Sequence, residues 1–156
     1  MTRHLTIVIG LVLFGGCATM GDVLDAKSAG RGTERVYPVS ADRAWDIART
    51  VFRWEGAAAI EEHRVEGYML TTLGQRTYAG AWVSPRGPEF SAVIVITKSH
   101  SPITELTEMR FHLDFVDALE YLRAGQPIPV RLPTATEVDC VRYGVAVMKS
   151  RGVTCP

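Results

Sequence analysis

The feature that most limits how this chain can fold is a short apolar run close to its N-terminus. Residues 5–14 carry no charge and are mostly aliphatic, and Arg3 and His4 precede them. A helix that crosses a bilayer needs about 20 such residues, so a run of this length is typical of the core of a cleaved signal peptide. The sequence therefore predicts that residues 1–16 are a signal peptide and that the remainder folds outside the cytoplasm.

The run is followed by a cysteine in a characteristic setting, Phe14-Gly15-Gly16-Cys17. A large apolar residue and two small ones before a cysteine resemble the lipobox of bacterial lipoproteins, in which leucine is more usual at the place of Phe14. The resemblance implies that the Cys17 thiol receives a lipid and that several acyl chains hold the protein firmly on a membrane. In a Gram-negative bacterium, Ala18 would favour the outer membrane, with the body facing the periplasm. The alternative is an ordinary secretory signal with a chance cysteine.

The chain divides into an anchor region and one folded body. Residues 17–34 are small, polar and glycine-containing without a sustained period, which predicts a lipidated cysteine followed by a flexible tether. Residues 35–156 are long enough for a single domain. Apolar residues make up 47% of the whole chain and charged residues 22%, a globular composition. Basic and acidic residues number 17 each, so no basic excess points to a nucleic-acid partner.

The hydrophobic pattern predicts an α+β fold. A helix is expected from Ala41 to about Glu55, between a capping Ser40 and Gly56, and a second from Thr136 to about Ser150. Helical turns are also expected over 117–123. This strand-helix-strands-helix order favours an antiparallel sheet of about five to six strands, with both helices packed on one face. The strands are expected at residues 35–39, 57–64, 68–73, 77–84, 90–98 and 103–113.

One stretch of the body has a familiar layout. Val36-Tyr37-Pro38-Val39-Ser40 leads to Ala44-Trp45, a helix, Gly56 and then Glu61–Tyr68. This resembles small bacterial outer-membrane lipoprotein domains of unassigned function, and it is similar to the repeat domain of BamC, a lipoprotein of the outer-membrane β-barrel assembly machine. The resemblance implies a fold and a compartment, with Trp45 holding the helix on the sheet. It carries no catalytic residues.

Two clusters of titratable residues are candidate metal or acid–base sites. On a strand, Glu61 and His63 share a face and Glu62 points away, which leaves too few ligands for a metal. Glu108, Arg110 and His112 are expected on one exposed strand face, where alternating charges pair across strands. Both clusters are better explained as solvated strand faces than as metal or acid–base sites. The sequence therefore predicts a protein that is not an enzyme, with no catalytic residues, metal or cofactor.

Two further features concern the C-terminal third. Cys140 and Cys155 are the thiols that remain after Cys17, and in an oxidising compartment they are expected to form a structural disulfide. Free thiols and a redox pair stay open as alternatives. The proline-rich segment Gln126–Pro133 is expected to be an extended loop. It either packs on its own domain or docks a partner through Ile128, Val130 and Leu132.

Two function classes remain. The first is a non-enzymatic interaction or structural module, held on the membrane by its lipid and bound to another envelope protein. The second is a small-ligand or lipid binder that uses a cavity between helix and sheet. A hydrolase or redox enzyme is a third class, for which the sequence offers no constellation.

Overall fold

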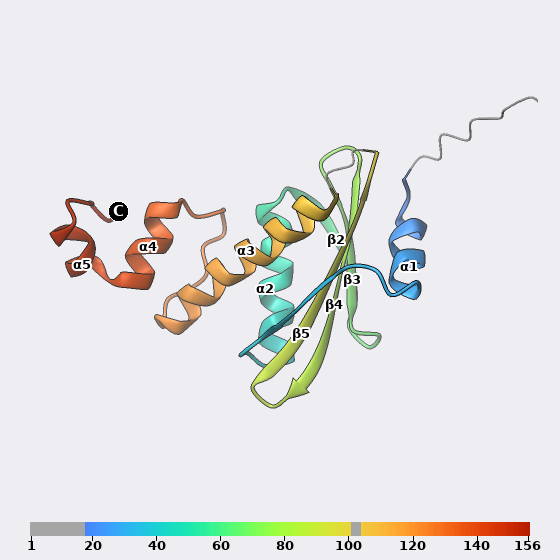
Figure 1. Ribbon diagram of the computed structural model, residues 1–156, viewed down its shortest axis with the longest axis horizontal. Coiled ribbons are helices and arrows are strands. Elements are labelled where there is room, and N and C mark those ends of the chain that lie inside the picture. Colours follow the sequence, from blue (N-terminus) through green and yellow to red (C-terminus); the bar gives the residue numbers. More distant parts are fainter. Residues whose placement is uncertain (1–17, 101–103) are drawn as a thin grey trace, which may run out of the picture.

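The computed structural model describes residues 18–100 and 104–156. The predicted signal peptide and the lipidated Cys17 therefore lie outside the described residues. The body contains one five-stranded antiparallel sheet in the order β1-β5-β4-β3-β2 (Figure 1), which confirms the predicted α+β class. The strands are β1 (Thr33–Tyr37), β2 (Ala57–His63), β3 (Tyr68–Leu73), β4 (Thr77–Gly87) and β5 (Phe90–Ser99).

Two helices, α2 (Ala41–Trp54) and α3 (Thr104–Arg123), cover one face of this sheet (Figure 1). The predicted helix 41–55 is confirmed, because α2 turns a continuous apolar stripe to the core. The Phe52 and Phe111 rings meet 4.9 Å apart between α2 and α3. The buried residues of α2 are Ala44, Trp45, Ile47, Ala48, Val51 and Phe52.

The strand predicted over residues 103–113 was wrong, because α3 occupies this segment. Alternating apolar residues in a short window fit a strand, but the same window continues with Phe111, Phe115, Ala118 and Leu119 at helical spacing. All four are buried, whereas Leu113 is exposed. The helical spacing of apolar residues, which continues over the 20 residues of α3, therefore determines the structure of this segment, and the local alternation does not. The second helix on the sheet is therefore α3 and not the last helix of the chain.

The opposite face of the sheet carries helix α1 (Met20–Ser28), shown at the right of Figure 1. The prediction of a flexible tether through residue 34 was wrong for these residues. Val23 and Ala26 are buried against Leu70 and Ile96 of the sheet. Because only these two helix residues are buried, the sequence carries almost no helical periodicity. What orders the segment is the apolar outer face of the sheet.

The last helical segment is broken in two, α4 (Ala135–Tyr143) and α5 (Val145–Ser150). The predicted single helix to Ser150 ends early because Gly144 has a φ of 81°, outside the helical range. The helix begins one residue before the expected cap, with Thr134 and Glu137 forming a reciprocal capping box. The pair packs beyond α3, away from the sheet (Figure 1).

Candidate functional site

Of the three residues expected on an exposed strand face, Glu108 and His112 form a buried polar network, and Arg110 is exposed. Glu108 and His112 lie one turn apart on α3 and both point into the protein. The His112 ring lies with Nε2 2.9 Å from the Thr33 carbonyl oxygen and Nδ1 2.7 Å from the Tyr37 hydroxyl. The Glu108 carboxylate accepts hydrogen bonds from the Thr33 hydroxyl at 2.7 Å and the Thr97 backbone N–H at 2.9 Å. The prediction of a solvated cross-strand triplet was therefore wrong.

This network fixes the protonation of its histidine. A carbonyl oxygen can only accept, so His112 Nε2 carries the proton and Nδ1 accepts from Tyr37. Burial lowers the pKa of His112, although the hydrogen bond to Thr33 opposes that shift. Burial also raises the pKa of the Tyr37 hydroxyl. A neutral, fully buried histidine with both nitrogens paired to β1 is a structural tie between α3 and β1, and Glu108 ties the same helix to β5 through Thr97.

A second titratable cluster, for which the sequence carries no local signal, lies between the C-terminal end of α2 and the middle of α3. Glu55 terminates α2, and neither of its carboxylate oxygens has a hydrogen-bond partner among the described residues. Burial, and to a lesser extent the nearby Asp114 carboxylate, raises the pKa of Glu55 to about 7, and Arg110 opposes the shift. Burial likewise raises the pKa of Asp114, whose Oδ2 lies 3.9 Å from Arg110 Nε.

Beside this carboxyl pair is an open hollow of about 500 Å³ at the edge of the helix–sheet layer. Trp54 and Glu55 come from the end of α2, Leu73 and Gly74 from the β3–β4 turn, and Leu106 from α3. Its size falls within the range of small-ligand sites. The hollow is thus the candidate for the helix–sheet cavity that a small-ligand or lipid binder would use.

The acidic cluster on β2 has the arrangement expected of a strand. Glu61 Oε1 lies 2.6 Å from His63 Nε2 on one face, and the His63 ring stacks on Tyr68 at 4.4 Å. Glu62 faces the other way and accepts a 2.9 Å hydrogen bond from the Trp45 indole N–H. Trp45 is thereby held to the sheet, as predicted. Within residues 18–100 and 104–156, no three His, Cys, Asp or Glu side chains are placed to hold a metal ion.

The two C-terminal cysteines are joined, Cys140 on α4 to Cys155. The turn at Gly144 and the left-handed Gly152 bring the terminal residues back beside α4. If the helix ran unbroken to Ser150, the residues after it would have to span a longer distance to bring Cys155 back to Cys140. The pairing agrees with the structural disulfide expected from sequence.

The proline-rich segment is an irregular loop, as predicted, and it is tied to its own domain. The Trp54 indole N–H donates to the Pro129 carbonyl oxygen at 3.0 Å, and Ile128 packs against the main core. Leu132 is half-buried. Of the three candidate contact residues only Val130 projects into solvent, at 93% exposure.

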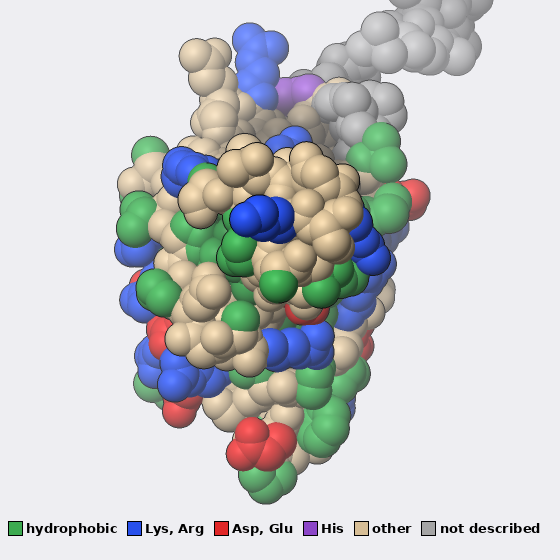
Figure 2. Space-filling model, turned by 90° about the vertical axis from the view of Figure 1, so that its left-hand side faces the viewer, with side chains coloured by type: hydrophobic (Ala, Val, Ile, Leu, Met, Phe, Trp, Pro, Cys, Tyr) green, Lys and Arg blue, Asp and Glu red, His purple; other side chains and the backbone are tan. Residues whose placement is uncertain are grey.

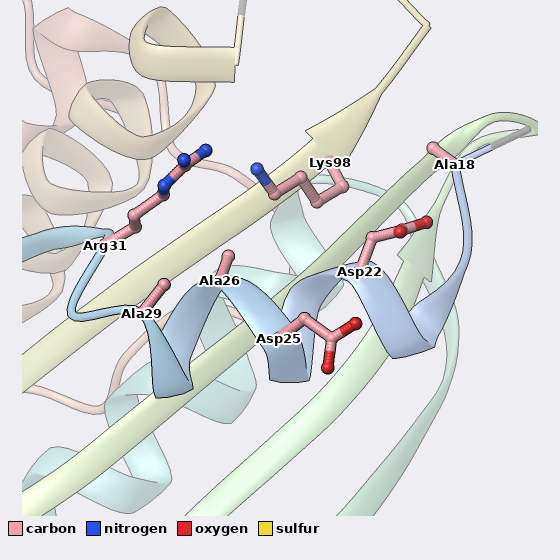
Figure 3. A pocket seen from close by; sticks show the side chains of 7 residues that line it. All are labelled: Ala18, Asp22, Asp25, Ala26, Ala29, Arg31 and Lys98. Carbon is pink, nitrogen blue, oxygen red and sulfur yellow. The ribbon is translucent and has the colours of Figure 1, made fainter. Parts of the chain in front are cut away.

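A groove of about 440 Å³ runs beside α1, next to the first described residue, Ala18 (Figure 3). Arg31 and Lys98 point toward one another across it, and the Asp22 and Asp25 carboxylates turn away from them (Figure 3). Hydrogen bonds from Thr19 lower the pKa of Asp22, with a smaller contribution from Lys98. Sequence reasoning missed this basic pair because it took the whole segment for a tether.

The end of the molecule formed by α4 and α5 faces the viewer in Figure 2, where hydrophobic side chains are interspersed with basic ones. Tyr143 and Val145 are among the exposed apolar residues there.

Comparisons of the chain with protein-family models, with curated proteins and with solved structures found no match. Function is therefore inferred from residues and geometry alone.

Proposed function

We propose that this chain is a lipid-anchored protein of the bacterial cell envelope that works as a non-enzymatic interaction module, facing the periplasm from the outer membrane. Two features support the compartment. The Gly15-Gly16-Cys17 pattern after an apolar run is typical of lipoprotein precursors. The Cys140–Cys155 bridge suits an oxidising compartment. None of the helices in the described parts of the chain is long and apolar enough to cross a membrane.

The observation that carries the interaction role is an unpartnered apolar stripe on α3. Leu106, Met109 and Leu113 are spaced i, i+3 and i+7, and they are 59%, 43% and 56% exposed. Residues at this spacing lie on one face of a helix. The C-terminal half of α3 is covered by α4. Arg142 of α4 forms an ion pair with Asp117 of α3 at 3.4 Å. The uncovered half offers a helix face that a second envelope protein would bury.

The anchoring is tested by fatty-acid labelling. Cells that produce the wild-type chain or Cys17→Ser are fed a clickable fatty acid, and only the wild type is expected to incorporate it, since a hydroxyl does not replace the thiolate as nucleophile. Equal labelling of both chains would contradict the proposal.

The interaction role is tested by photocrosslinking in native membranes. A photoreactive residue at Leu106 or Leu113 is expected to trap a discrete partner, whereas the same residue at Val65, which is 97% exposed on the β2–β3 turn, is not. Val130 is tested in parallel as the accessible residue of the proline-rich segment. Identical crosslink patterns at Leu106, Leu113 and Val65 would mean that the stripe recognises nothing.

The second candidate function is binding of a small ligand or lipid in the hollow beside Glu55. The observation that favours it is Glu55, which lines the hollow and whose two buried carboxylate oxygens have no hydrogen-bond partner among the described residues. A ligand that donates hydrogen bonds or carries a positive charge would complement them. Native mass spectrometry of the protein extracted from membranes separates the two functions: a retained small molecule that is lost in Glu55→Gln, which leaves the α3 stripe unchanged, favours the binder.

A further inference from the structure

The position of α1 constrains how the proposed anchor would hold the body. Cys17 is bonded to Ala18, so their Cα atoms are about 3.8 Å apart. Ala18 in turn contacts the groove beside α1, and Thr19 caps that helix. Since α1 is packed on the sheet through Val23 and Ala26, a lipid on Cys17 would meet the body at one fixed place rather than at the end of a long tether.

Two basic side chains converge at the same place. Arg31 follows α1 and Lys98 ends β5, and Figure 3 shows their charged groups pointing toward one another across the groove. Neither forms an ion pair within the described ranges. Like charges repel, so this arrangement favours an anion between them.

We propose that the groove lined by Ala26, Ala29, Arg31 and Lys98 receives the phosphate of an anionic lipid headgroup in the membrane to which the chain is anchored. Arg31 and Lys98 donate to the phosphate oxygens, and the small side chains of Ala26 and Ala29 leave room for it. Asp22 and Asp25 also line the groove, but their carboxylates turn away from the basic pair (Figure 3). This inference rests on the proposed lipid anchoring, and it adds that α1 orients the body on the membrane.

The test uses the intact lipidated protein in vesicles. A fluorophore is attached at Ser28→Cys, an exposed position on α1 that does not line the groove. Quenching by a nitroxide on lipid headgroups is measured in phosphatidylcholine vesicles with and without phosphatidylglycerol. We expect stronger quenching when phosphatidylglycerol is present, and loss of that difference at high salt, because the attraction is electrostatic.

Two charge-matched variants separate the groove from general charge. Arg31→Gln with Lys98→Gln is expected to abolish the phosphatidylglycerol effect. Lys149→Gln with Arg151→Gln removes the same charges from α5 and is expected to retain it. A fluorophore at Val65→Cys, on the far turn of the sheet, is expected to remain unquenched in every vesicle. Equal quenching at Ser28 in both vesicles, or in both double variants, would overturn the proposal while leaving the anchor intact.

A further arm distinguishes the lipid from free phosphate. If inorganic phosphate cancels the phosphatidylglycerol effect and raises the melting temperature of the wild type, but not that of the groove variant, the site takes free phosphate and the lipid assignment fails. Absence of fatty-acid labelling would instead remove the anchor, and with it both this inference and the proposed location.

Discussion

At the scale of single residues, the pKa of the Glu55 carboxyl group is shifted far from its ordinary value. In the folded protein its pKa rises from 4.5 to about 7, because burial and Asp114 disfavour the charged form. The folded state therefore holds a proton that the unfolded state releases, and stability falls as the pH rises from about 4.5 to 7. Above that window the cost is constant.

We expect Glu55→Gln to stabilise the protein at pH 8 by about 1–3 kcal/mol, since the amide removes a buried charge. Below pH 4.5 the variant and the wild type should be alike. Chemical denaturation across pH measures this, with Glu105→Gln as the control because Glu105 is an exposed glutamate on α3. If the free energy of unfolding had the same pH dependence in Glu55→Gln and in the wild type, ionisation of Glu55 would not destabilise the folded protein.

His112 gives the opposite pH dependence. Its folded pKa lies below the ordinary 6.5, so the unfolded state binds the proton first and stability is lost as the pH falls through that region. We expect His112→Gln to remove this acid limb, at some loss of overall stability, and His63→Gln to keep it. Titration of the imidazole signals by NMR provides the direct measurement, and a His112 pKa at or above 6.5 would contradict the burial argument.

At the scale of elements, α1 is held on the sheet by only two buried residues, Val23 and Ala26. Val23 is fully buried against the sheet, whereas its neighbour Leu24 is 38% exposed. Burying one valine contributes about 1.5–3 kcal/mol, enough to decide whether so short a helix stays docked.

We therefore expect Val23→Asp to release α1 while the rest of the sheet stays folded. Backbone amides of residues 20–28 should then exchange at least roughly tenfold faster. Leu24→Asp, one position along, is the matched control and should leave exchange unchanged. Similar exchange in the two variants would mean that α1 does not depend on the Val23 contact.

The contrast between α2 and α3 shows what a hydrophobic pattern can and cannot predict. The stripe of α2 was readable because its apolar residues face one core, with Trp45 at its centre. The stripe of α3 is blurred because Glu108 and His112 are buried with the apolar residues, and Leu106 and Leu113 are exposed. Burial of polar groups paired across β1 and β5 is a tertiary property that no local period records.

At the scale of the whole molecule, the disulfide closes a separate C-terminal unit. It joins residues 15 apart, and α4 contacts the rest of the protein mainly through α3. A loop of this length stabilises by about 3 kcal/mol in the chain-entropy account. The gain should be confined to α4 and α5, because the sheet and its two covering helices do not depend on the bridge.

We expect Cys140→Ser with Cys155→Ser to speed amide exchange in residues 135–150 and to leave β3, β4 and β5 protected. Reduction of the wild type should reproduce the effect, and reduction of the double variant should add nothing. If the strands lost protection as well, α4 and α5 would be part of the global folding unit.

The fold class, helix α2, five strands and the cysteine pair of this protein could be predicted from local patterns in its chain. Each of these features has a local signal in the sequence: an apolar period, a capping residue before the helix, a glycine after it, or two cysteines close enough in the chain to pair. Sequence also supplied the anchoring hypothesis, through the residues around Cys17.

The remaining features were set by the tertiary structure. It ordered α1, because the outer face of the sheet offers Leu70 and Ile96 to two small apolar residues. It made residues 104–123 a helix, and it brought Glu55 to Asp114 and Arg31 to Lys98 across elements distant in the chain. Such contacts depend on which faces the sheet leaves free, and this is settled only when all of its strands have paired.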